Sequence, residues 1–260
     1  MKLACLDGAL IDESQAFIPA TDDGLLRGDG VFEVMRLYDS RPFAIDDHLA
    51  RMESSAANLR LPLDTAAVRA DIESLLAEAK PGDGLVRVIV TRGGHRLALI
   101  EPLPEMPPTL SMGIVTYSPT RVLDGVKSLS YGGNMLATRL AKERGFDEAL
   151  LVTPHGRVLE APTSSFFWAQ GGELFTPPLT EHILDSITRR RLLEVVDVTE
   201  RETTPDDLRS ADEAFLASSV REALPVNRIE DIELQTTGPL TAQAGERLRE
   251  RIADELAAAS

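Results

Sequence analysis

Four prolines within ten residues, in "IEPLPEMPPT" at positions 100–109, divide the chain into two regions. Proline fixes its own φ angle and donates no backbone hydrogen bond, so this stretch is typical of an extended linker or a domain boundary. Residues on both sides show strand-like alternation and helical spacing. The sequence therefore predicts an α+β protein with a small N-terminal domain over 1–110, a linker over 111–120 and a larger C-terminal domain over 121–260.

The N-terminal region begins with hairpin signals and continues with two helices. The Asp-Gly pair in "KLACLDGALI" and the Asp39–Ser40 pair in "GVFEVMRLYDSRPFAI" each separate two apolar runs. Helical spacing follows in "DDHLARMESSAANLRL", where Asp46 or Asp47 is the expected N-cap, and in "DTAAVRADIESLLAEAK". The apolar run in "GLVRVIVTRGG" predicts a further strand.

The C-terminal region is expected to contain more strands than helices. "SMGIVTY", "GVKSLSY" and "EAFLASS" predict strands, and "EALLVTPHGRVLEA" and "SFFWAQGGELFTPP" predict two hairpins with glycine in their turns. Asn134–Arg144 predicts a helix that ends before Gly145, because glycine favours the position after a helix. Two further helices are predicted in "DSITRRRLLEVV" and "TAQAGERLRERIADELAAA".

Composition excludes several classes of protein. A net charge of -15 and a pI near 4.7 argue against nucleic acid as a partner, since its phosphates are bound by basic side chains. The single cysteine, Cys5, leaves no internal disulfide framework and fits a reducing compartment. No run of about 18 apolar residues occurs, and Asp7 and Asp12 interrupt the N-terminal segment. We therefore expect a cytoplasmic globular protein with no membrane partner.

Lysine is rare in this chain, and at one position the choice of lysine has no evident structural explanation. The sequence contains 23 arginines but four lysines, which are Lys2, Lys80, Lys127 and Lys142. Lys127 lies in a short run of small and apolar residues, and in an extended segment it would share a face with Leu129 and Tyr131. Its amine could reach water at a sheet edge. Alternatively, a buried amine that loses its proton can form a Schiff base with a carbonyl, which a guanidinium cannot do.

Seven segments between about Thr21 and Val226 give the chain a resemblance to a known family. In order, they are "RGDGVFEVMR", "HLARM", "TRGG", "KSL…N", "DEALLVTPHGRVLEAPTSSFF", "ITRRRLLE" and "FLASSVREALPV". Together they resemble the class IV pyridoxal-phosphate enzymes of fold type IV, which include D-amino-acid transaminases, branched-chain transaminases and aminodeoxychorismate lyase. The resemblance implies a two-domain fold type IV enzyme, with a β-barrel-like core in the larger domain and pyridoxal 5'-phosphate as cofactor.

The resemblance also implies roles for individual residues. Lys127 matches the family lysine that forms the Schiff base and carries the proton at the substrate α-carbon. Glu160, in "RVLEAP", matches the carboxylate that keeps the pyridine nitrogen protonated, and Arg51, in "HLARM", matches the phosphate-binding arginine. Taken alone, Glu160 could be a surface charge and Arg51 a solvated side chain. The other implied contacts with the cofactor ring and phosphate are Leu184, Ser186, Ile187, Thr188, Ser218 and Ser219.

Substrate contacts are expected on one strand of the N-terminal region. In "GVFEVMR", Phe32, Val34 and Arg36 alternate onto one face and, by resemblance, line the pocket. The D-amino-acid transaminases tend to have valine where Val34 stands, whereas branched-chain members tend to have glycine and the lyases threonine. Arg96, in "TRGGHRLAL", matches the arginine that binds a substrate carboxylate in D-amino-acid enzymes, but Ala98 replaces the histidine usual two residues later.

The sequence thus predicts a transaminase that exchanges amino and keto groups between an amino acid and a 2-oxo acid, with a pocket like that of D-amino-acid transaminases. Two other activities remain open, which are 4-amino-4-deoxychorismate lyase, releasing pyruvate and 4-aminobenzoate, and branched-chain transaminase. A non-catalytic cofactor-binding protein would require Lys127 to be unbonded. By resemblance, we expect a homodimer whose partners are small-molecule amino and keto acids.

Overall fold

The computed structural model describes residues 2–258 and divides the chain into two compact units. Unit 1 extends to Pro104 and also includes Gly125–Tyr131, and unit 2 contains Glu105–Asp124 and the chain from Gly132 onward. These boundaries differ from the predicted ones. Much of the predicted linker over 111–120 belongs to a strand of unit 2, in which Met112 is fully buried.

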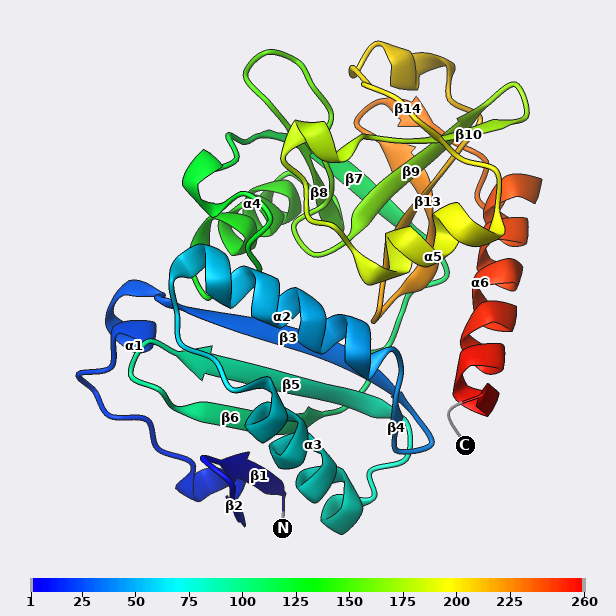
Figure 1. Ribbon diagram of the computed structural model, residues 1–260. Helices are drawn as coiled ribbons and strands as arrows, with labels where there is room; N and C mark the ends of the chain where they lie inside the picture. Colours follow the sequence, from blue (N-terminus) through cyan, green and yellow to red (C-terminus); the bar gives the residue numbers. More distant parts are fainter. Residues whose placement is uncertain (1, 259–260) are drawn as a thin grey trace. The chain divides into compact units, whose positions relative to one another are not determined.

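Unit 1 is a six-stranded antiparallel sheet in the order β2-β1-β6-β5-β3-β4, covered on one face by two helices (Figure 1). Its strands are β1 (Leu3–Leu6), β2 (Ala9–Asp12), β3 (Gly30–Tyr38), β4 (Arg41–Pro42), β5 (Gly84–Thr91) and β6 (Arg96–Glu101). Its helices are α1 (Asp23–Arg27), α2 (Ile45–Leu59) and α3 (Thr65–Ala79), with a 3-10 turn at Glu13–Gln15. Both predicted hairpins and both long helices are confirmed.

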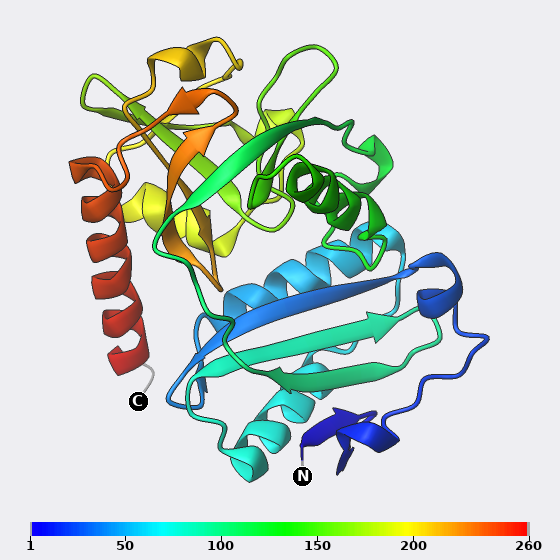
Figure 2. The ribbon, with the colours of Figure 1, turned by 180° about the vertical axis from the view of Figure 1, so that it is seen from behind.

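The two faces of this sheet differ in character. One face packs its alternate residues, including Val31, Met35 and Val88, against the apolar sides of α2 and α3 to form the core of the unit. The other face carries Phe32, Val34 and Arg36 of β3, because successive residues of a strand point to opposite sides. Figure 2 shows this second face, with the strands in front of the helices. Any ligand of β3 on that face is therefore separated from the helix-facing core.

Helix α2 differs from its prediction at its first residue. The expected caps were Asp46 or Asp47, but the helix begins at Ile45 and its N-cap is Ala44, in the left-handed region at φ 52° and ψ 41°. Both aspartates lie in the first turn, where negative charge is favourable next to the positive end of the helix dipole. The pattern predicted the helix correctly and its first turn approximately.

Unit 2 is built on a curled, half-barrel sheet in the order β11-β10-β9-β12-β13-β7-β8, with β14 paired to β13. Its strands are β7 (Leu110–Thr116), β8 (Glu148–Val152), β9 (Ser165–Gln170), β10 (Glu173–Thr176), β11 (Thr199–Glu200), β12 (Glu213–Ser218), β13 (Glu222–Ile229) and β14 (Ile232–Glu233). Its helices are α4 (Gly132–Glu143), α5 (Ile187–Val195) and α6 (Pro239–Ala258), with 3-10 turns at Arg121–Leu123, Leu179–Glu181 and Asp207–Ser210.

The core of unit 2 is aromatic. Phe166 and Trp168 of β9 point to one side of the sheet, and Trp168 lies 4.8 Å from Phe175 of β10. On the other side, Phe167 stacks on Phe215 of β12 at 4.8 Å with nearly parallel rings. β9 is therefore buried on both faces, which explains why its sequence is a continuous apolar run.

Two predicted strands form isolated bridges instead of ladders. In "GVKSLSY", Ser128 bridges to Val31, and in the second half of "EALLVTPHGRVLEA", Val158 bridges to Val152. The first segment still uses its backbone groups, since Leu129 donates its N–H to the carbonyl of Gly30. Within residues 2–258, none of the helices combines the length and apolar character needed to cross a membrane.

Gly30 offers a direct test of how tightly β3 is packed. A Cβ added there would lie 2.5 Å from the carbonyl oxygen of Val90 and 2.6 Å from Cδ1 of Leu129. Because a backbone atom cannot move aside easily, we expect Gly30→Ala to lower the free energy of unfolding by about 1–3 kcal/mol, measured by denaturant melts. The matched variant Gly132→Ala, with no described heavy atom within 4 Å of the new Cβ, should unfold like the parent. Equal effects in both variants would contradict this packing.

Candidate active site

The backbone of Lys127 is fixed by two elements of unit 1. Its carbonyl accepts a hydrogen bond of 3.1 Å from the N–H of Phe32 in β3, and its own N–H donates to Oγ of Ser55 in α2 at 3.1 Å. Ser55 is fully buried on the sheet-facing side of α2. Lys127 therefore has a defined position relative to both the sheet and the helix, although it lies outside any regular strand.

The side-chain amine of Lys127 lies on the sheet face that carries Phe32. Its Nζ is 4.4 Å from the centroid of the Phe32 ring and 5.8 Å from that of Tyr131. These two rings meet edge to face, with centroids 5.2 Å apart and an interplanar angle of 83°. Although the described segment "GVKSLSY" does not form the predicted strand, Lys127 and Tyr131 lie near each other, and two aromatic rings shape the surroundings of the amine.

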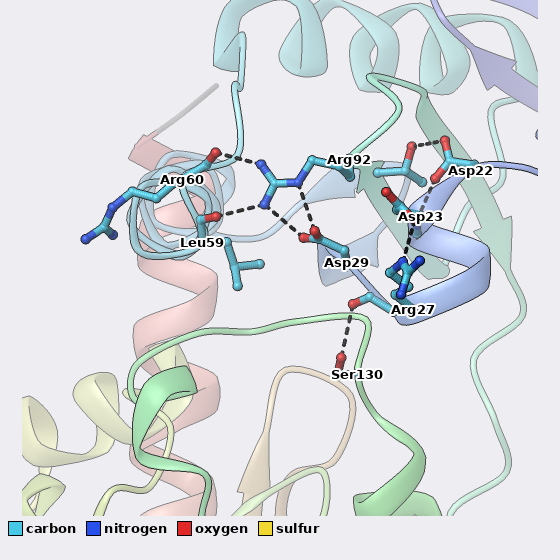
Figure 3. A network of polar contacts seen from close by, with 11 residues as sticks. Asp22, Asp23, Arg27, Asp29, Leu59, Arg60, Arg92 and Ser130 are labelled. Carbon is cyan, nitrogen blue, oxygen red and sulfur yellow. Dashed lines mark hydrogen bonds and ion pairs between the residues drawn. The ribbon is translucent and has the colours of Figure 1, made fainter.

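A polar network holds the turn that precedes β3 (Figure 3). Arg92 binds both carboxylate oxygens of Asp29 at 2.9 and 3.0 Å, and it also donates to the carbonyls of Leu59 and Arg60 at the end of α2. Ser130, which follows Lys127 by three residues, donates its hydroxyl to the carbonyl of Gly28 at 3.1 Å. One arginine therefore joins the "RGDG" turn to α2, and the segment of Lys127 is bonded to the same turn.

Arg51, the predicted phosphate-binding arginine, belongs to a buried cluster of charges. Its Nε and Nη2 donate to the two carboxylate oxygens of Glu33 at 2.7 Å each, so the pair is bidentate. His48, one helical turn earlier on α2, contacts the same carboxylate through Nδ1 at 2.7 Å. The side chains of Glu33 and His48 are buried, and that of Arg51 is 11% exposed. The guanidinium is thus oriented by a carboxylate from the sheet.

The charge states in this cluster follow from burial and pairing. Burial alone would raise the pKa of Glu33, but the charge and hydrogen bonds of Arg51, together with those of His48, lower the pKa to about 2. Burial lowers the pKa of His48 below 6.5, although Glu33 opposes this. At neutral pH, His48 is therefore uncharged and donates its Nδ1–H to the ionised Glu33, so the charges of Glu33 and Arg51 cancel within this trio.

In unit 2, Glu160 follows β8 and the bridge between Val152 and Val158. Its Oε1 accepts a hydrogen bond of 3.1 Å from the N–H of Leu184. Burial raises the pKa of the Tyr117 hydroxyl, and the nearby negative charge of Glu160 raises it further. That hydroxyl donates to Oδ1 of Asn134 at 3.2 Å. Glu160 is therefore a partly buried carboxylate held in place by the backbone.

The residues of unit 2 that were predicted to bind the cofactor phosphate lie at the start of α5 and at the end of β12. Ser186 is the N-cap of α5, and its Oγ accepts from the N–H of Arg189 at 3.3 Å. Ile187 and Thr188 form the first turn, where backbone N–H groups have no acceptor within the helix and favour an anion. Ser218 and Ser219 begin the β12–β13 turn, and Oγ of Ser218 accepts from the N–H of Arg221 at 3.2 Å.

Arg96 lies apart from the other predicted substrate residues. Phe32, Val34 and Arg36 share the sheet face of the Lys127 amine, but Arg96 pairs with Val90 on the face that packs against the helices. There its Nε donates to the buried carboxylate of Asp71 in α3 at 2.8 Å. Within one copy of unit 1, the structure therefore does not bring Arg96 together with the other three side chains.

Glu33 and Arg87 were not among the site residues predicted from the sequence. Each is a charged residue with apolar neighbours on both sides, in "VFEVM" and in "LVRVIV", and this isolation is a signal that could have found both. Ser55 gave no such signal, since a serine on a helix is common and only the fold shows which backbone group it meets. The positions of Glu33, Ser55 and Arg87 therefore extend the predicted site.

Comparison with known proteins identifies the family. The profile described as "Amino-transferase class IV" matches residues 30–229. Among curated relatives, a proposed branched-chain-amino-acid aminotransferase of Methanocaldococcus jannaschii is 33% identical over 94% of each chain. A D-alanine aminotransferase of Bacillus licheniformis is 30% identical over 96% of this chain and 97% of its own. An aminodeoxychorismate lyase of Bacillus subtilis is 30% identical over 87% of this chain and 86% of its own.

Solved structures agree with the family profile. A fold IV transaminase from Curtobacterium pusillum has a TM-score of 0.83 at 29% identity, with 92% of each chain covered. A hypothetical aminotransferase from Mycobacterium tuberculosis, solved in its PLP-bound form, has a TM-score of 0.89 at 25% identity, covering 98% of this chain and all of the other. The chain belongs to the class IV aminotransferase family and has its fold type IV architecture, as the sequence predicted.

The buried cluster around Glu33 predicts sensitivity to acid. Because the pKa values of Glu33 and His48 are lowered on folding, the unfolded chain binds more protons and acidification favours unfolding. The contribution of His48 is lost as the pH falls through about 6.5, and that of Glu33, on the order of 3 kcal/mol, is lost from about pH 4.5 downwards. Thermal melts should therefore show a marked loss of stability between pH 5 and pH 3.

A variant isolates the part of this effect due to Glu33. Glu33→Gln cannot ionise, so its melting temperature should fall less between pH 5 and pH 3 than that of the parent. Asp206→Asn, which replaces a carboxylate that is 96% exposed, provides the matched control and should follow the parent. If Glu33→Gln and the parent lose the same stability over this interval, the assigned charge state of Glu33 is refuted.

Proposed function

We propose that this protein is a pyridoxal-phosphate-dependent transaminase that exchanges amino and keto groups between a D-amino acid and a 2-oxo acid. The observation that carries the proposal is the position of Lys127. Its backbone is fixed by β3 and α2, and its amine lies on the sheet face of Phe32 and Val34. A lysine kept in a chain that otherwise prefers arginine fits this need, because only an amine can bond covalently to a carbonyl.

The chemistry of the available side chains fits this cofactor. Lys127 offers an amine for its aldehyde, Glu160 a carboxylate for its ring nitrogen, and Arg51 a guanidinium for its phosphate. We propose that Leu184 contacts the ring, and that the phosphate also binds at the α5 N-terminus and the β12–β13 turn, through Ser186, Ile187, Thr188, Ser218 and Ser219. When bound, pyridoxal phosphate supplies a carbonyl that combines with amines and a ring that accepts electrons from the substrate α-carbon.

The residues of the chain supply binding and proton transfer. The side-chain nitrogen of Lys127 would serve as the base that takes the proton from the substrate α-carbon. Glu160, positioned by the N–H of Leu184, keeps a negative charge beside the ring nitrogen and so favours its protonated form. Arg51 would donate hydrogen bonds to the phosphate, and Glu33 holds its guanidinium in one orientation.

The preference for D-amino acids rests on the strand β3. Val34 presents an apolar side chain on the substrate face, with Phe32 before it and Arg36 after it. This is the pattern that resembles the D-amino-acid transaminases, and one relative of nearly full coverage is a D-alanine aminotransferase. A valine offers no hydroxyl to a substrate, which disfavours the lyase reaction of another relative.

A substrate panel tests the assignment. The enzyme loaded with pyridoxal phosphate should form pyruvate from D-alanine and 2-oxoglutarate, followed by coupling to lactate dehydrogenase, at a higher kcat/KM than with L-alanine, L-leucine or L-valine. Release of 4-aminobenzoate from aminodeoxychorismate, without amino transfer, would instead establish the lyase. Faster reaction with L-leucine or L-valine than with any D-amino acid would establish a branched-chain transaminase.

The role of Glu160 predicts a separate kinetic effect. Glu160→Gln keeps the hydrogen bond from Leu184 but loses the negative charge, so we expect kcat to fall on the order of 10²-fold while the cofactor stays bound, as its absorbance will show. Glu173→Gln, at an exposed position on β10, should retain the parent kcat. A Glu160→Gln enzyme with unchanged kcat would remove Glu160 from the site.

We further propose that the enzyme is a cytoplasmic homodimer. Phe17, Leu25 and Leu26 are 71%, 66% and 62% exposed, and a second copy of the chain would cover such apolar side chains. The single, buried Cys5 fits a reducing compartment. Sedimentation velocity should show a species of twice the chain mass, and a monomer at micromolar concentration would refute the dimer.

A further inference from the structure

We propose that Arg87 binds the carboxylate of the substrate, in place of Arg96. This inference rests on the proposed transaminase function, since it assigns a further binding residue to the same site. Arg87 is the one charged residue of β5, a strand at the centre of the sheet of unit 1. Its side chain is 31% exposed, so a ligand can reach it from the sheet face.

Strand register places Arg87 on the substrate face. Its antiparallel partners are Val34 in β3 and Leu99 in β6, and directly opposed residues point to the same side of a sheet. The guanidinium carbon of Arg87 is 5.8 Å from the centroid of the Phe32 ring, and Nζ of Lys127 is 4.4 Å from the same centroid. A carboxylate-binding cation and the proposed reactive amine thus contact one aromatic ring.

The geometry of Arg87 already shows that it can bind a carboxylate. Its Nε and Nη2 donate to the two oxygens of Glu101 at 2.6 and 3.0 Å, and among the described residues Glu101 is its only hydrogen-bond partner. This pair leaves the donors of Nη1 for a second acceptor. Glu101 is 34% exposed, so it can orient the guanidinium and yield part of it to a ligand at little cost.

Other arginines of unit 1 are less suited to this role. Arg96 lies on the opposite face of the sheet, and its Nε donates to Asp71, which is nearly buried. Arg36 shares the face of Arg87, but its guanidinium carbon lies 4.7 Å from the ring of Tyr38, two residues farther along β3. Phe32 therefore lies next to the Lys127 amine, and Arg87, which pairs with Val34, lies beside the same ring.

The kinetic test compares Arg87→Gln with the matched variant Arg96→Gln. Loss of a charged hydrogen bond should raise KM for both D-alanine and 2-oxoglutarate in Arg87→Gln, on the order of 10- to 100-fold, with a smaller change in kcat. The half-reaction with 1-phenylethylamine, an amine without a carboxylate, should be unchanged, and Arg96→Gln should behave as the parent. Unchanged KM values in Arg87→Gln, or an equal loss with 1-phenylethylamine, would overturn the proposal.

A binding measurement separates this proposal from the proposed function. Calorimetry on the cofactor-loaded protein should show that propionate binds to the parent more tightly than propionamide does, and that Arg87→Gln loses this difference. Glu101→Gln removes the competing carboxylate, so propionate should bind to it at least as tightly as to the parent. Cofactor absorbance confirms that each variant is folded.

Two further outcomes would separate the carboxylate site from its alternatives and from the proposed function. If Arg96→Gln loses the preference for propionate and Arg87→Gln keeps it, the carboxylate is assigned to Arg96 and the proposal fails. If the parent transfers no amino group to any keto acid but still prefers propionate through Arg87, the transaminase function fails while the carboxylate site stands.

Discussion

The backbone hydrogen bonds of Lys127 determine most of what the site can do. A lysine side chain has four rotatable carbon bonds and would sample many positions if its backbone were also mobile. Here Phe32 of β3 and Ser55 of α2 bind its carbonyl and N–H, and Arg92 joins the turn before β3 to the end of α2. The amine thereby lies beside the rings of Phe32 and Tyr131.

The buried cluster of Glu33, His48 and Arg51 shows how an arginine can be held ready for an anion. A lone guanidinium would adopt several orientations, and burying it without a counter-ion would be costly. Glu33 neutralises and orients Arg51, and burial keeps His48 uncharged, so the trio carries no net charge while the guanidinium keeps a fixed direction. The same strand thus presents Glu33 to the helices and Phe32 and Val34 to the substrate face. Because successive residues of β3 point to opposite faces of the sheet, the orientation of Arg51 and the lining of the substrate face use different residues of one strand.

Much of the fold was predictable from the sequence, because it depends on periodicity and local turn chemistry. The hairpins around Asp7 and Asp39, the long helices and the aromatic hairpin of unit 2 follow from patterns a few residues long. The unit boundaries were not predictable, since Gly125–Tyr131 joins unit 1 through bonds to β3, far away in sequence. The candidate site residues were predicted from family resemblance. The sheet face on which Arg96 and Arg87 lie depends instead on strand register, which no local pattern fixes.

The central claim is that Lys127 is the residue that bonds covalently to the cofactor. Reducing the yellow, cofactor-loaded protein with borohydride and mapping the tryptic peptides by mass spectrometry tests it most directly. We predict that the pyridoxyl group will be found on the peptide that contains Lys127, and that Lys127→Ala will carry none. A pyridoxyl group on another lysine, or on no peptide of the parent protein, would contradict the account.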